Sequence, residues 1–134
     1  MNRNRRSILL VCSLILCSVY LTECNTIKFK HGERAYLRYC ADCHMEDGKG
    51  VAKLYPSLFD SDLVADSKIL PCLIVNGYND SMTIMQMVPV EGISSIDITN
   101  ITNYLRQDLL SLEGTVTIQQ VDRTLENCSQ NIVK

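Results

Sequence analysis

The feature that most constrains this chain is the run Cys40-Ala41-Asp42-Cys43-His44, which holds two thiols and an imidazole close together. Residues three positions apart lie about one turn apart on a helix, so the two thiols would project side by side at a helix end. Donor groups held so closely suit a prosthetic group, a metal ion or a redox pair. The surrounding chain must therefore be built to place one of these.

Three interpretations of the run each lack a feature that they need. A thioredoxin-like redox pair would need a βαβ context, but no alternating strand pattern surrounds the run. A zinc site would need a second pair of ligands, which His31 and the other cysteines do not supply at a suitable spacing. A disulfide between Cys40 and Cys43 would be sterically tight and would leave His44 without a role.

The run is also the attachment motif of c-type haem, and we favour this interpretation. The thiols of Cys40 and Cys43 would each form a thioether with one vinyl group of a single haem c. His44 would lie beneath the iron as an axial ligand. A haem bound covalently cannot dissociate, which suits a protein that is exported.

The N-terminal sequence predicts export. Arg3, Arg5 and Arg6 precede an apolar run over residues 8–21. This run is shorter than the roughly 20 residues that a helix needs to cross a bilayer. We therefore interpret residues 1–23 as a signal peptide rather than as a permanent transmembrane span.

The stretch Leu21-Thr22-Glu23-Cys24 resembles the lipobox of bacterial lipoproteins, in which the cysteine is lipidated and becomes the new N-terminus. Glu23 departs from the small residue of the common pattern. We expect lipidation at Cys24; cleavage elsewhere, an uncleaved anchor and an incidental thiol are the alternatives. Residues 24–30 would then form a short tether and residues 31–134 one domain, because 134 residues are one domain's worth of chain.

The charge of the exported part limits its partners. Without residues 1–23 the chain has ten basic and fourteen acidic side chains, a net charge of −4. Because a basic excess is missing, we expect no nucleic-acid partner. The acidic charge favours a basic partner surface and argues against direct binding to anionic lipid.

The hydrophobic pattern predicts an all-α fold with four or five short helices. The expected helices lie at residues 32–39, 60–65 and 68–75, after a start signal at Ser94, and after a capping box at Thr117. Residues 45–57 and 77–92 read as loops. Short helices joined by long loops bury little of one another, so we expect a cofactor to fill the core.

Over residues 30–104 the chain resembles the class I c-type cytochromes, which are small monohaem electron carriers. Five residues stand at the intervals of the family's pattern G-x-x-x-[FY]-x-x-x-C-x-x-C-H: Gly32, Tyr36, Cys40, Cys43 and His44. The resemblance implies a cytochrome c-like fold, in which the glycine lets the first and last core helices cross closely. Ile101 and Tyr104 match the partner positions on the last core helix.

The resemblance also implies the surroundings of the iron. Pro56 follows His44 by twelve residues, as the family's proline does, so its carbonyl would accept a hydrogen bond from the second ring nitrogen of His44. The stretch beginning Met87-Val88-Pro89 resembles the family's M-P-x-F-x-x-L-S stretch, which makes Met87 the expected second axial ligand. Met85 is the next candidate and His31 a distant third.

The resemblance also implies a role for two of the remaining cysteines. The setting of Cys72 and Cys128 resembles a subgroup of bacterial monohaem cytochromes that join these two points by a disulfide, which an oxidising periplasm permits. Two unpaired buried thiols are the alternative. Cys12 and Cys17 fall in the expected signal peptide.

Taken together, these expectations predict a function. A His/Met pair fills both axial positions and leaves the iron no open site for a substrate. We therefore expect an electron carrier rather than an enzyme, exported to the periplasm, anchored to a membrane by lipid, and passing single electrons between redox proteins. The alternatives are a haem subunit of a larger oxidoreductase, and a haem enzyme or gas sensor in which Met87 is displaceable.

Overall fold

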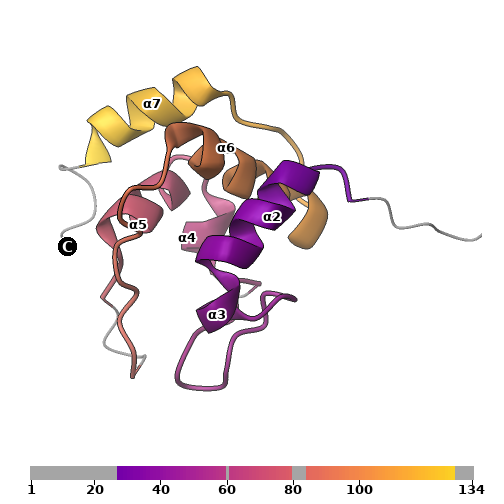
Figure 1. Cartoon of the computed structure of the whole chain (residues 1–134), viewed down its shortest axis with the longest axis vertical. Helices are drawn as coiled ribbons and strands as arrows, with labels where there is room; N and C mark the ends of the chain where they lie inside the picture. Colours follow the sequence, from indigo (N-terminus) through magenta and orange to yellow (C-terminus); the bar gives the residue numbers. More distant parts are fainter. Residues whose placement is uncertain (1–26, 60, 80–83, 129–134) are drawn as a thin grey trace, which may run out of the picture.

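A computed structural model of the chain describes residues 27–59, 61–79 and 84–128 (Figure 1). The expected signal peptide and Cys24 lie outside these residues. The described part is helical, and it contains two isolated bridges but no strand. Its elements, in order, are α2 (Lys30–Tyr39), α3 (Ala41–His44), α4 (Asp62–Ala65), α5 (Leu70–Asn76), α6 (Ser95–Tyr104), the π-helix η1 (Leu105–Leu109) and α7 (Ile118–Glu126). The all-α prediction is confirmed, but the described residues contain six α-helices and one π-helix where four or five helices were expected.

Helix α6 lies at the centre of the fold and contacts α2, α5 and α7 (Figure 1). Its start is set by Ser94, whose side chain accepts a hydrogen bond from the backbone N–H of Asp97 at 3.1 Å. Ile98 and Ile101 face inward and are almost completely buried. At Leu105 the helix widens into η1, whose first residue is also buried.

The crossing of α2 and α6 depends on Gly32. A Cβ atom at this position would overlap the carbonyl oxygen of Asn100 and would lie 2.5 Å from Cβ of Tyr104. The absence of a side chain therefore brings the two backbones together. One turn later, the rings of Tyr36 and Tyr104 pack with their centroids 5.5 Å apart. The resemblance to the class I c-type cytochromes implied this close crossing of the two helices.

Helix α7 begins with a capping box and is linked to α5 by a disulfide just beyond its other end. The predicted capping box is present: the Thr117 hydroxyl accepts from the Gln120 N–H, and the Gln120 side chain accepts from the Thr117 N–H. Just beyond the other end, the sulfur atoms of Cys72 and Cys128 lie 2.03 Å apart in a disulfide. The two cysteines are 56 positions apart, and the chain-entropy model assigns a closed loop of that size about 4 kcal/mol of stabilisation.

Within the described ranges, no helix has the length and apolar character needed to cross a membrane.

Candidate functional site

A cavity of about 490 Å³ lies between the C-terminal end of α2, α3, the loop before α4, α4, α5, α6 and the segment 85–90. Its volume falls within the range of small-molecule and cofactor sites. The wall is mostly apolar and includes Leu58, Leu70, Leu73, Ile74 and Ile101. It also includes most of the residues that the sequence singled out: Cys40, Cys43, His44, Pro56, Met85 and Met87.

The junction of α2 and α3 presents both thiols to this cavity. Helix α2 ends before Cys40, which becomes the N-cap of the four-residue helix α3. The backbone N–H groups of Cys43 and His44 both donate to the Cys40 carbonyl, at 3.2 and 2.9 Å. This tight turn brings the three side chains of the motif to one wall. Cys40 is half-buried and Cys43 exposed, and neither belongs to a disulfide.

The surroundings of Cys40 disfavour its thiolate form. Burial raises the pKa of the Cys40 thiol to about 12, and the neighbouring Cys43 adds to the shift. Reactive C-x-x-C pairs work in the opposite direction, because they need a thiol whose pKa is lowered so that the thiolate forms near neutral pH.

His44 is oriented by a single backbone contact. Its Nδ1 atom lies 3.1 Å from the carbonyl oxygen of Pro56, which is the contact implied by the resemblance. Because a carbonyl can only accept, Nδ1 carries the proton and Nε2 keeps its lone pair. Burial lowers the pKa of His44 because the charged imidazolium loses hydration, although the Pro56 carbonyl opposes this shift. The neutral imidazole is the form that binds metals.

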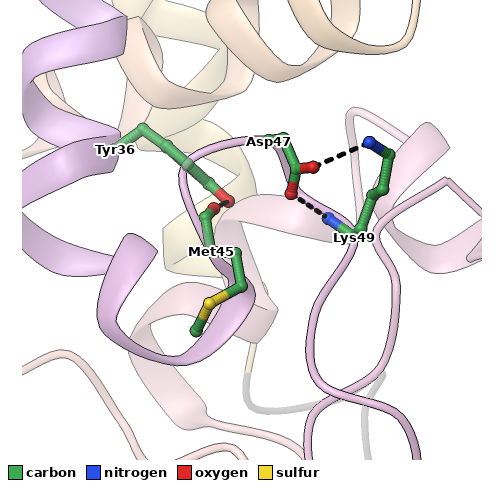
Figure 2. Close-up of polar contacts among 4 residues, drawn as sticks. All are labelled: Tyr36, Met45, Asp47 and Lys49. Carbon is green, nitrogen blue, oxygen red and sulfur yellow. Dashed lines mark hydrogen bonds and ion pairs between the residues drawn. The ribbon is translucent and has the colours of Figure 1, made fainter.

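The loop between His44 and Pro56 begins with a turn that Tyr36 holds in place (Figure 2). The Tyr36 hydroxyl donates to the Met45 carbonyl at 2.6 Å, and its burial raises the pKa of the phenol. The Asp47 carboxylate accepts from the Lys49 ammonium at 2.8 Å and from the Lys49 backbone N–H at 3.1 Å. These contacts of Lys49 lower the pKa of Asp47.

Gly50 lets the loop return to the histidine. Its φ is +66°, and its N–H donates to the His44 carbonyl at 3.0 Å. A Cβ atom there would lie 2.6 Å from the Pro56 carbonyl oxygen, the same atom that contacts His44. The glycine therefore leaves room for the Pro56 carbonyl to reach the imidazole ring.

Met87 is brought to the cavity by pairing with the end of α5. Met87 and Tyr78 form an antiparallel bridge with two backbone hydrogen bonds of 2.9 Å. Val90 N–H then donates to the Ile74 carbonyl at 2.9 Å. Gly77, with a φ of +71°, permits the close approach of the Met87 carbonyl. The backbone around Met87 is thus fixed on both sides.

The other ligand candidates are placed differently. Met85 also lines the cavity, but 45% of its surface is exposed, whereas Met87 is half-buried. Met82 lies outside the described residues. His31 is on the exposed face of α2, where its Nδ1 atom lies 3.1 Å from the Arg34 guanidinium, and it is not part of the cavity wall.

No group of three or more His, Cys, Asp or Glu residues in the described part could hold a metal ion. A zinc site of the usual kind is therefore missing from these residues. The donors gathered at the cavity are two thiols, one imidazole and thioethers. A comparison of the sequence with protein-family models and with curated proteins finds no match.

Sequence reasoning missed Tyr78 and Gly77. Both help to position the segment that carries Met87, through the bridge and the close backbone approach. The signal in the sequence is weak, because the bridge joins only one residue to one residue across a loop. The glycine after the expected helix at residues 68–75 was the one local hint.

Proposed function

We propose that the chain is a monohaem c-type cytochrome that carries single electrons between redox proteins. The observation that carries this proposal is the placement of a C-x-x-C-H motif and a backbone-anchored methionine on the wall of one apolar cavity. The donor set suits a haem: two thiols for thioether bonds, an imidazole and a thioether for the axial positions. When bound, a haem supplies the one-electron redox couple.

The residues around the cavity would hold the haem and set its reduction potential. The Pro56 carbonyl fixes the tautomer of His44, so Nε2 is the atom available to the iron, and it strengthens the imidazole as a ligand. Met87 supplies sulfur from a segment fixed by Tyr78 and Ile74. A His/Met pair raises the reduction potential and leaves no open coordination position, so electrons would pass without substrate binding at iron.

The apolar walls contribute by excluding water. Side chains such as Leu58, Leu70 and Ile74 are almost completely buried and line the cavity. A water-poor surrounding disfavours extra positive charge, which stabilises the reduced form of a redox centre.

We further propose that the protein works in the periplasm, anchored by a lipid at Cys24. The supporting observations are the basic and apolar N-terminal segment, the lipobox-like stretch and the disulfide between Cys72 and Cys128. Disulfides persist in oxidising compartments.

One observation favours a haem subunit of a larger oxidoreductase as a second candidate. Ile84 and Val88 are 69% and 73% exposed on the segment that carries Met87, and Val88 also lines the cavity. A permanent partner covering this segment would bury both side chains. Native purification separates the two proposals: a free carrier elutes as a monomer, whereas a subunit co-purifies with its oxidoreductase.

The optical spectrum tests the assignment of the ligands. We expect sharp low-spin bands in the ferrous protein and the weak far-red ferric band of an iron–thioether bond. Met87→Ala should lower the reduction potential and open the iron to carbon monoxide, and Met85→Ala is the matched control that should do neither. If Met85→Ala shows these effects and Met87→Ala does not, the ligand assignment is wrong. A high-spin spectrum of the unmodified protein would favour a haem enzyme or gas sensor.

A further inference from the structure

The outward face of α2 carries three basic side chains. Lys30, Arg34 and Arg38 are exposed and stand four positions apart, on the side of the helix opposite to the buried Gly32 and Ala35. We call these three cations the α2 basic face. The one acidic side chain of α2, Glu33, is half-buried and lies at the flank of the face.

No carboxylate of the described residues forms a salt bridge with this face. In the described ranges, the one salt bridge joins Lys49 to Asp47, on the loop after α3. The Arg34 guanidinium contacts the ring nitrogen of His31 at 3.1 Å, and the Arg38 guanidinium lies 5.1 Å from the centroid of the Tyr39 ring. Neither partner is a carboxylate. The three positive charges therefore remain available to an external anion.

The N-terminal lead enters α2 at a fixed place. The backbone N–H groups of Lys28 and Phe29 donate to the Asp108 carboxylate on η1 at 3.0 and 2.7 Å. Figure 1 shows the coloured segment before α2 at this end of the helix, on the side away from α5. These two hydrogen bonds fix where the chain enters α2.

Only a short polar segment separates the apolar N-terminal run from Ile27. The apolar run ends at Leu21, so only residues 22–26 separate it from Ile27. A chain of that length spans at most about 20 Å when fully extended. Lys30, the first residue of α2, follows Leu21 by nine residues, so with a lipid on Cys24 or an uncleaved apolar segment as anchor it would lie within about 30 Å of the membrane surface.

We propose that the α2 basic face lies on the anionic lipid headgroups of the membrane that holds the N-terminus. Anionic lipid attracts basic residues near its surface, by about 1 kcal/mol for each Lys or Arg, and a short anchor keeps this face within reach. An anchor and a polybasic patch together form the usual pair of signals for stable membrane attachment. The inference does not depend on haem attachment.

This proposal reverses what the net charge alone suggested. The charge of −4 averages over the whole exported surface, but charges separated by more than about 10 Å are largely screened at physiological salt. Glu33 and the Asp108 carboxylate lie near the first turn of α2 and offset part of its charge, whereas acidic residues far from α2 contribute little to the field there. Because Cys40 follows the last turn of α2, a helix lying on the membrane would hold the cavity beside the bilayer, about 15 Å along the helix from the tether.

Lysine footprinting of the full exported protein tests the proposal. The protein is reconstituted in phosphatidylcholine vesicles, with or without an equal amount of phosphatidylglycerol, and treated with an amine-acylating reagent. Lys30 should react about tenfold more slowly on the anionic vesicles at low salt, and its reactivity should return at high salt. Lys53 and Lys68, which are exposed on other segments, are internal controls and should not change.

Two matched variants test whether the face acts as a unit. Arg34→Gln with Arg38→Gln should abolish the protection of Lys30, while Lys68→Gln with Arg123→Gln, which removes the same charge from other elements, should leave it intact. Equal reactivity of Lys30 on neutral and anionic vesicles would overturn the proposal and would turn attention to an acidic protein surface as the occupant. Equal effects of the two double variants would also overturn it, because net charge would then be the cause.

Discussion

Gly32→Ala tests the helix crossing at the base of the candidate site, and two opposing effects decide the sign of its outcome. In the interior of an unpacked helix, alanine is more favourable than glycine by about 1 kcal/mol. Here the new Cβ would meet the Asn100 carbonyl oxygen and Cβ of Tyr104. Both atoms belong to or adjoin the backbone of α6, so neither can rotate away.

Overpacking in a rigid core costs about 1 to 3 kcal/mol, and the upper end applies when backbone must move. The expected net change is therefore a loss of about 2 kcal/mol in the free energy of unfolding, or roughly 10 °C in Tm for a domain of this size. Guanidinium denaturation followed by circular dichroism measures it. Leu37→Ala, on an exposed position of the same helix, is the control and should change stability by less than about 0.5 kcal/mol. A Gly32→Ala variant as stable as the parent, or more stable, would refute the close crossing.

Two further substitutions probe the parts of the fold that position the site. Replacing both Cys72 and Cys128 by alanine should remove about 4 kcal/mol of stability, measured as a lower denaturation midpoint; an unchanged midpoint would mean that the disulfide does not form in the exported protein. Met45→Gly should instead stabilise the protein by about 1 kcal/mol, because Met45 has a φ of 62° and a ψ of 162°, a conformation that favours glycine. A lower Tm for Met45→Gly would show that its side chain matters more than its backbone.

The elements that the sequence predicted well are those with local causes. Ser94 and Thr117 cap their helices through groups within three residues, so the signals can be read from short stretches. The helix expected at residues 68–75 is observed at Leu70–Asn76, with Pro71 in its first turn as proline requires. The contact between His44 and Pro56 followed from a family resemblance and could not have been derived from spacing alone.

The elements that the sequence did not predict depend on contacts between residues far apart in the chain. The π-helix η1 contains Arg106. The Arg106 guanidinium donates to the carbonyl oxygens of Ala65 and Glu113, which lie on segments far from one another in the chain. The bridge between Tyr78 and Met87 likewise depends on where α5 ends. The net charge of the exported part did not reveal that Lys30, Arg34 and Arg38 share one side of α2, because a sum over all side chains contains no positions.

The most direct test of the central claim is the intact mass of the denatured protein after export in a host with a cytochrome c maturation system. The account predicts a mass increase of one haem, which survives denaturation because the bonds to Cys40 and Cys43 are covalent, and which the double variant Cys40→Ala, Cys43→Ala lacks. An unmodified mass for the wild-type chain, in cells that mature a control c-type cytochrome, would contradict the proposed function.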